Sequence, residues 1–169
     1  MGLFKNLFNS AEKLEPFDVD DNEIVAVADG KIVENSTITD EVFAQEMMGK
    51  TITFNYDKDK VTLCAPANGV LTVLFPTGHA FGITTNTGVE LLVHCGVNTV
   101  NSKGEGFKLC SKKQGEAVKA GDPIVEVNMK LLKQTYDMST MLIVTNPNDK
   151  EINFIAPQTV TRGQSLLQK

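Results

Sequence analysis

The stretch FPTGHAFGITTNTGVELLVHCGVNTV, residues 75–100, decides how this chain folds. Two runs rich in apolar and β-branched residues flank a turn at residues 85–88, a pattern typical of a β-hairpin. The chain has 2 histidines, and one lies at the outer end of each run. A residue just before the first strand lies opposite a residue just after the second, so we expect His79 and His94 to be cross-strand neighbours.

Side chains alternate across the expected strands, 80–84 and 89–93. His94 therefore shares its face with Leu92 and Glu90, whereas Cys95 points to the other face. Two imidazoles on one partly apolar face predict an active site, because histidine is the side chain whose charge and proton are most easily controlled near neutral pH.

Three other chemistries are disfavoured. A Cys/His nucleophile pair would need Cys95 on the face of His94. A zinc hydrolase would need three protein ligands, and the sequence shows no evident third ligand beside the histidines. The residues Met129-Lys130-Leu131 faintly resemble a biotin-carrier motif, but the following run, 131–136, continues as a helix and not as a returning strand.

Short apolar runs separated by Gly, Asn and Asp turns continue along the chain. They predict a mainly β fold: an antiparallel β-sandwich or flattened barrel, a duplicated barrel-sandwich hybrid, with a few short helices. The turns Asn68-Gly69 and Gly121-Asp122 hint at the duplicated half-motif. Besides the histidine hairpin, the expected strands are a first hairpin over 24–38, broken at Asp29-Gly30, and the runs 51–55, 60–64, 70–75, 117–127, 138–145, 152–156 and 165–168.

Two short helices are expected. The first spans 41–48, is capped by Thr39 or Asp40 and ends at Gly49, with Met47 and Met48 in the core. The second covers one or two turns within 129–136.

Composition narrows the function. With 169 residues, 41% of them hydrophobic, the chain fits one globular domain. The net charge of −5 and the absence of a Lys/Arg block argue against nucleic acid as a partner and favour a basic protein. The 3 cysteines show no CxxC spacing, which fits a reducing cytoplasm. No run reaches the ~20 apolar residues of a membrane span, and no secretory signal is recognisable.

Residues 1–22 are expected to be a flexible N-terminal segment, and residues 23–169 the globular domain. Apolar residues recur at helical spacing within residues 1–10, which predicts a short amphipathic helix with weak, reversible membrane contact. Residues 11–22 are acidic, contain Pro16 and are interpreted as a linker.

Residues 88–100, GVELLVHCGVNTV, resemble the phosphorylation-site signature of the glucose-type IIA components of the bacterial phosphoenolpyruvate-dependent sugar phosphotransferase system. The resemblance runs from about Glu23 to the C-terminus, with the blocks in family order. Two positions depart from it: Lys50-Thr51 stand where the family usually has Asp-Gly, and Asn98 stands where it often has an acidic residue. The further matching blocks are 65–69, 76–81, 103–107 and 121–124.

The resemblance implies a role for each residue of the hairpin. His94 would accept a phosphoryl group on Nε2 while the main-chain carbonyl of Gly96 holds its other nitrogen. His79 would donate to the phosphoryl oxygens, and the hydroxyl of Thr77 would orient its ring. No cofactor is required, although a zinc ion bridging His79 and His94 to a partner carboxylate is compatible with these residues.

Partner contacts follow from the same resemblance. Phe43, Phe75 and Leu92 match an apolar rim used for docking. Asp40 and Asn98 match positions that meet the basic face of the phosphocarrier protein HPr.

The resemblance thus implies a bacterial cytoplasmic phosphocarrier that works at the inner face of the membrane. It would accept a phosphoryl group from HPr and pass it to the cysteine of the IIB domain of a sugar permease. The alternative is a regulatory module that binds transporters or kinases through the same apolar face.

Overall fold

Antiparallel strands form most of the regular structure in the computed structural model, which describes residues 14–169. They make two sheets, one of eight strands in the order β11-β1-β2-β10-β6-β5-β4-β8 and one of three in the order β3-β9-β7. The strands are β1 (Gly30–Val33), β2 (Lys50–Asn55), β3 (Lys60–Cys64), β4 (Gly69–Leu74), β5 (Ala80–Thr85), β6 (Glu90–Cys95), β7 (Phe107–Leu109), β8 (Ala117–Val118), β9 (Pro123–Asn128), β10 (Thr140–Asn146) and β11 (Thr159–Val160). The helical elements are η1 (Asn35–Thr37), α2 (Glu41–Ala44), η2 (Thr99–Ser102) and α3 (Met129–Leu132).

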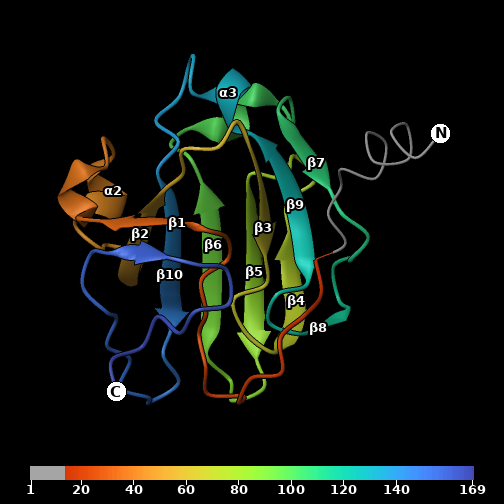
Figure 1. Cartoon of the computed structure of the whole chain (residues 1–169), viewed down its shortest axis with the longest axis vertical. Helices are drawn as coiled ribbons and strands as arrows, with labels where there is room; N and C mark the ends of the chain where they lie inside the picture. The colour runs from red at the N-terminus through yellow and green to blue at the C-terminus, as the bar shows by residue number, and fades with distance from the viewer. Residues whose placement is uncertain (1–13) are drawn as a thin grey trace.

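The core lies between the two sheets. Alternate side chains of both sheets are buried in one cluster, including Leu63 of β3, Val125 of β9, Phe81 of β5 and Leu91 of β6. Removing this apolar surface from water is the main favourable term in such a fold. The expected antiparallel sandwich with a few short helices is thus confirmed (Figure 1).

The histidine hairpin forms as expected from β5 and β6, but its register differs by one residue. Ala80, not His79, lies opposite His94, and the backbone oxygen of His79 accepts a hydrogen bond from the amide of Cys95 (2.8 Å). The expected alternation along β6 is confirmed, because Leu91 and Cys95 are buried while His94 is only half-buried. The other edge of β6 pairs with β10, so the strand that carries His94 is held on both sides.

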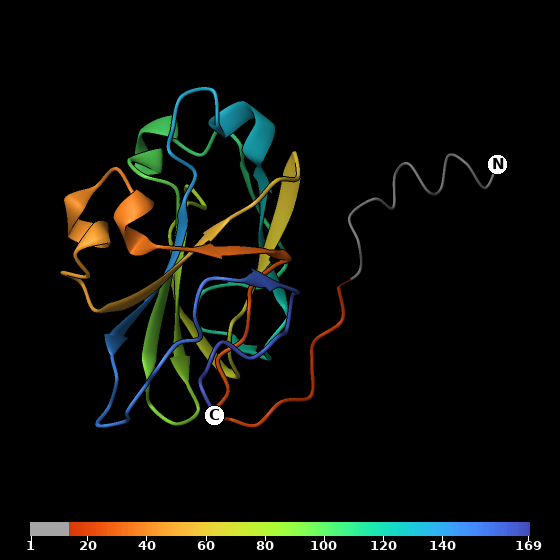
Figure 2. The same cartoon turned by 60° about the vertical axis from the view of Figure 1, so that its left-hand side comes forward.

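A second, smaller core lies on the outer face of the large sheet, beneath α2. Its buried members are Ile38, Phe43, Val97, Met141 and Ile143, and we call it the α2 cluster. Figure 2 shows α2, in orange, on the opposite side of the molecule from β3. The large sheet is therefore covered on both faces at β10, by the main core and by the α2 cluster. This packing holds β10 in place, and β10 in turn supports β6.

The helix at α2 is shorter than expected. Asp40 caps it, accepting a hydrogen bond from the amide of Val42 (2.8 Å), but the helix ends at Ala44. Glu46 has a φ of +54°, which an α-helix does not allow. Because helical spacing is lost, Met47 and Met48 are 69% and 42% exposed, and their predicted place in the core was wrong.

Other expectations at the ends of the chain were also wrong. Residues 24–28 do not form a hairpin with 30–38, because β1 pairs with β2 and β11 instead. The apolar run 24–28 is buried and bonds to several segments, for example through Val25 to Pro66 and Ala26 to Gly163. The expected strands 152–156 and 165–168 are reduced to isolated bridges, whereas β7 and β11 were not predicted.

Residues 14–22 contact the sandwich. The amide of Phe17 donates to the carbonyl of Ala120 (2.8 Å), and the guanidinium of Arg162 lies 4.4 Å from the Phe17 ring centre. The expected boundary at residue 23 stays a prediction, and the expected amphipathic helix in residues 1–10 lies outside the described residues. None of the helices within residues 14–169 has the length and apolar character needed to cross a bilayer.

Candidate active site

The rings of His79 and His94 meet at one end of the β5–β6 hairpin. Their centres are 5.3 Å apart and their planes are nearly perpendicular, at 79°. His94 is in β6, whereas His79 ends the turn before β5. The direction of the His79 side chain is therefore not determined by the alternation of side chains along a strand. Gly78 makes this turn with a φ of +78°, packed so closely on Phe107 that a Cβ would lie 2.9 Å from that side chain. The turn therefore brings the His79 ring beside the His94 ring, although Ala80 and not His79 is paired with His94.

His94 is oriented by its own backbone. Its Nδ1 lies 2.8 Å from the carbonyl oxygen of Gly96. Because a carbonyl can only accept, Nδ1 carries the proton, and the neutral ring presents its lone pair on Nε2. Gly96 has a φ of +81°, and a Cβ there would lie 2.4 Å from Cγ2 of Thr99. Glycine is thus required for the carbonyl to return to the ring two residues earlier.

His79 is held by a side chain instead. Its Nδ1 lies 2.6 Å from Oγ1 of Thr77. A hydroxyl can donate as well as accept, and when it donates to Nδ1 the ring carries its proton on Nε2. In that tautomer His79 offers an N–H to an anion, whereas His94 offers a lone pair. The two rings are thus able to play complementary parts in one reaction.

Both rings are uncharged at neutral pH. Burial lowers the pKa of the His94 imidazole to about 4, and the adjacent His79 acts in the same direction. The Gly96 carbonyl and the Asp40 carboxylate oppose this shift without cancelling it. Burial also lowers the pKa of His79. A neutral imidazole is the nucleophilic form, so His94 is available for attack at pH 7.

Each histidine has a phenylalanine beside it. Phe43 lies 4.9 Å from His94 between ring centres, and Phe75 lies 5.0 Å from His79. Phe43 is 8% exposed and belongs to the α2 cluster, whereas Phe75 is 40% exposed. Of the three residues expected at the apolar rim, Phe75 is therefore open to a partner, Leu92 is half-buried, and Phe43 supports the ring from below.

The two polar rim residues occupy different settings. Asp40 is half-buried, caps α2 and acts electrostatically on His94. Asn98 is exposed and has a φ of +59°, a left-handed conformation that asparagine tolerates better than most residues. Asp40 precedes α2 and Asn98 precedes η2, and within residues 14–169 neither forms a hydrogen bond to the histidine rings.

The cysteines do not suit a nucleophilic role. Cys95 is buried, and burial raises the pKa of its thiol to about 12. Its Sγ accepts a hydrogen bond from the Thr140 hydroxyl on the core side of β6. The biotin-like lysine, Lys130, lies in α3 and not at a hairpin tip. Within residues 14–169, no cluster of three or more His, Cys, Asp or Glu side chains could hold a metal ion.

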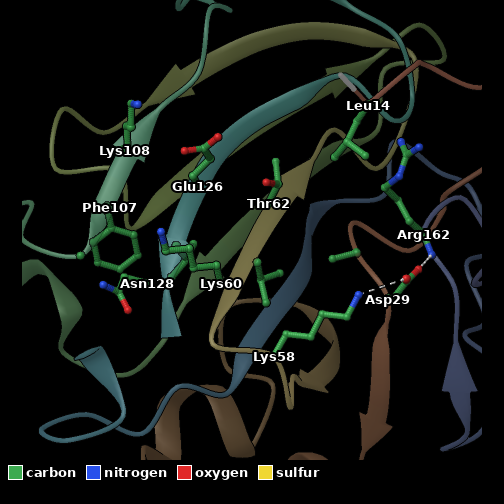
Figure 3. A pocket seen from close by; sticks show the side chains of 14 residues that line it. Leu14, Asp29, Lys58, Lys60, Thr62, Phe107, Lys108, Glu126, Asn128 and Arg162 are labelled. Carbon is green, nitrogen blue, oxygen red and sulfur yellow. Dashed lines mark hydrogen bonds and ion pairs between the residues drawn. The ribbon is translucent and has the colours of Figure 1, made fainter. Parts of the chain in front are cut away.

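A hollow of about 710 Å³ lies elsewhere, and neither histidine lines it. Figure 3 shows it over the face of β3, β9 and β7, where Glu126 is flanked by Lys108 and Thr62 on the neighbouring strands. One of its lysines, Lys58, forms an ion pair with Asp29 (3.9 Å). Because neither histidine lines the hollow, it does not form part of the histidine site.

One residue near the site was not singled out from the sequence. Asp137 precedes β10, and its carboxylate accepts hydrogen bonds from both Thr39 and Ser139. The only local signal is the Asp-x-Ser spacing, which is typical of a turn closed by its own side chain. The contact with Thr39 spans 98 positions of the chain and leaves no local pattern.

Comparisons with known proteins identified a matching family and several relatives. Residues 22–150 match the family model described as phosphoenolpyruvate-dependent sugar phosphotransferase system, EIIA 1. The PTS system glucose-specific EIIA component of Haemophilus influenzae is 34% identical over 170 residues, which is 99% of this chain and 97% of the relative. The protein of the same description from Halalkalibacterium halodurans is 38% identical over 85% of this chain and 83% of the relative.

Two further matches concern a larger protein and a solved structure. The glucose-specific EIICBA component of Staphylococcus carnosus is 32% identical over 85% of this chain but only 21% of its own length. Glucose permease IIA from Mycoplasma capricolum has a similar structure, with a TM-score of 0.78, 34% identity, and coverage of 86% of this chain and 93% of that one.

Proposed function

The chain belongs to the EIIA 1 family of the phosphoenolpyruvate-dependent sugar phosphotransferase system, and we propose that His94 is the residue on which it carries the phosphoryl group. The protein is a phosphocarrier that accepts a phosphoryl group from HPr and passes it to a IIB domain during sugar uptake. The observation that supports His94 is the hydrogen bond from its Nδ1 to the Gly96 carbonyl (2.8 Å), which leaves Nε2 as the nucleophile.

The transfer exchanges one phosphorus–nitrogen bond for another. Nε2 of His94 attacks the phosphorus of phosphorylated HPr, the new bond forms with the Nε2 lone pair, and the bond to the histidine of HPr breaks with its electrons returning to that ring. The Nδ1–H of His94 stays hydrogen-bonded to Gly96 throughout, so positive charge that develops on the phosphorylated ring is stabilised by the carbonyl.

His79 serves as the phosphoryl stabiliser in this proposal. Its ring centre is 5.3 Å from that of His94, and Thr77 holds its Nδ1, so Nε2–H can donate to a phosphoryl oxygen. The low exposure of His79 strengthens such a bond, because a charged group is attracted more strongly where water is excluded. Thr77 and Gly96 are thus proposed to orient the two rings.

Partner docking is proposed to use the exposed rim. Phe75 supplies an apolar contact beside His79, with Leu92 contributing from β6. Asp40 gives the site a negative group that suits the basic face of HPr, and Asn98 offers a neutral polar contact. The relatives are named glucose-specific, so the IIB domain of a glucose-type permease is the acceptor to test first.

Location, metal use and regulation belong to the same proposal. Because HPr and a IIB domain are its phosphoryl donor and acceptor, we propose that the protein works in the cytoplasm, at the inner face of the membrane. The nucleophile and the stabiliser both come from this chain, so no cofactor is needed for transfer. To bind a zinc ion shared with a partner carboxylate, His79 would take its other tautomer, with Nδ1–H donating to Thr77, so that Nε2 of both histidines supplies a lone pair. Regulatory binding of transporters or kinases would use the Phe75 side of the site.

Incubation with phosphorylated HPr tests the proposed function. The protein should gain one acid-labile, base-stable phosphate, and mass spectrometry under basic conditions should locate it on His94. A regulatory binding module without carrier activity would bind partners and gain no phosphate. A phosphate on any other residue would contradict the assignment of His94.

A further inference from the structure

We propose that Asp137 is a positioning residue that holds the two walls of the histidine site together and thereby fixes the orientation of His94. The inference rests on the proposed function for its consequence in phosphoryl transfer. Its geometric part concerns only residues of this chain and is tested separately below.

The Asp137 carboxylate accepts four hydrogen bonds. Oδ1 accepts from the amide of Ser139 (2.9 Å) and from its hydroxyl (2.7 Å). Oδ2 accepts from the amide of Thr39 (3.1 Å) and from its hydroxyl (3.0 Å). Each oxygen thus serves one segment, and the two segments are joined through a single side chain.

One segment supports the residue that orients His94. The amide of Gly96 donates to the carbonyl of Ser139 (2.9 Å), and the amide of Val97 donates to the carbonyl of Asp137 (2.8 Å). The Gly96 backbone also packs closely here, since a Cβ on it would lie 2.9 Å from Sδ of Met138. The loop 137–139 therefore fixes the peptide whose carbonyl holds Nδ1 of His94.

The other segment leads into α2. Thr39 directly precedes Asp40, the residue that caps the helix, and Phe43 in that helix lies 4.9 Å from the His94 ring. Thr39 itself is exposed, whereas the preceding residue, Ile38, is buried in the α2 cluster. The two hydrogen bonds of Thr39 to Asp137 add a polar connection between the start of α2 and the loop beside Gly96.

The carboxylate stays charged at working pH. Burial by itself would raise the pKa of Asp137, but the hydrogen bonds from Ser139 and Thr39 outweigh it and lower the pKa. Hydrogen bonds to an ionised acceptor are stronger than those between neutral groups. The polar connection is therefore made of charge-assisted bonds, which suits a role in holding precise geometry.

Asp137→Asn tests the proposal directly. The substitution keeps the shape but replaces one acceptor oxygen by an NH₂ group, which cannot accept from Thr39 or Ser139. The readout is the ¹⁵N spectrum of the His94 imidazole. The native protein should show one tautomer, protonated on Nδ1, whereas the variant should show a mixture because the Gly96 carbonyl is displaced. Phosphate uptake from HPr should slow about tenfold, because small displacements at a reacting group are costly.

Asp20→Asn is the matched control. Asp20 also accepts from a backbone amide and a side chain, both of Asn22 (2.8 and 2.9 Å), and also has a lowered pKa. Within residues 14–169, its carboxylate forms no hydrogen bond to a residue of the histidine site. This variant should keep both the tautomer and the rate of the native protein.

Two milder variants cover the case in which Asp137→Asn does not fold. Thr39→Val and Ser139→Ala each remove one hydroxyl bond to the carboxylate, and each should shift the tautomer in the same direction by a smaller amount. The proposal is overturned if folded Asp137→Asn, or both milder variants, retain the single tautomer and the native rate. If the native protein takes no phosphate at all, the proposed function fails, and the ¹⁵N spectra still decide the role of Asp137.

Discussion

The Nδ1 of His94 lies 2.8 Å from the carbonyl oxygen of Gly96, which follows it in the chain with only one residue between them. The chain segment that carries the proposed nucleophile thus also supplies the acceptor for its ring, by turning sharply at a glycine with a φ of +81°. Gly96 is therefore a residue whose replacement should affect stability and chemistry together.

Gly96→Ala should destabilise the fold and slow phosphate uptake. The left-handed conformation costs about 1 kcal/mol or more for alanine, and the added methyl would lie 2.4 Å from Thr99. Gly115→Ala is the control, because Gly115 has a φ of +93° but no atom within 4 Å of the added Cβ. Thermal unfolding and uptake kinetics of both variants would separate conformational strain from the close contacts of the added methyl with Thr99 and Met138. Equal effects in the two variants would refute the importance of those contacts.

Substitution of each histidine should divide the transfer into its halves. His94→Gln should take up no phosphate, because the site then lacks a nucleophilic nitrogen. His79→Gln should still accept phosphate but transfer it to the IIB cysteine about a hundredfold more slowly, since loss of one donor to a developing charge costs on the order of 3 kcal/mol. Rapid-quench measurement of both half-reactions is the test. Uptake by His94→Gln with none by His79→Gln would reverse the two roles.

The two phenylalanines at the site should respond differently to truncation. Phe75 is 40% exposed, so Phe75→Ser should raise KM for HPr and for the IIB domain while thermal stability hardly changes. Phe43 is 8% exposed, so Phe43→Ala should cost about 3 kcal/mol of unfolding free energy. Chemical denaturation and steady-state kinetics on both variants give the comparison. A large stability loss for Phe75→Ser would place that ring in the core.

Stability should fall as the solution is acidified. The pKa of His94 is about 4 in the folded protein against 6.5 for the free side chain, so between these values the unfolded chain binds more protons. The free energy of unfolding therefore rises with pH in this window. The contribution of neutral His94 to stability is fully present above about pH 6.5 and is lost as the pH falls towards 4. From pH 7 to 5 the loss should be on the order of 1 to 2 kcal/mol. Urea denaturation of His94→Gln should show a flatter dependence, and identical slopes would contradict the lowered pKa.

The parts of the fold that follow from local pattern could be predicted. The β5–β6 hairpin has alternation, β-branched residues and a turn at 85–88, and all of these act between neighbours in sequence. The alternation also placed His94 and Cys95 on opposite faces correctly. The roles of Thr77 and Gly96 needed the family resemblance, because no spacing rule connects a ring nitrogen to a particular hydroxyl or carbonyl.

The remaining features depend on contacts between distant segments. The offset of His79 from His94 arises in the turn at Gly78, which packs closely against the distant residue Phe107. The early end of α2 follows from the left-handed Glu46, whose carboxylate accepts from the Thr51 amide (2.8 Å). The buried run 24–28 satisfies its backbone with several separate segments, which an alternation of apolar residues cannot reveal.

The opposite facing of His94 and Cys95 has a consequence for the fidelity of the phosphoryl relay. The onward acceptor is a cysteine of another domain, and the chain has a thiol of its own on the very next residue. The pleat of β6 directs that thiol into the core, where its high pKa keeps it protonated and the sheet itself stands between donor and thiol. With His94 as the proposed carrier residue, this arrangement prevents transfer of the phosphoryl group to the chain's own sulfur and keeps the group for the IIB domain.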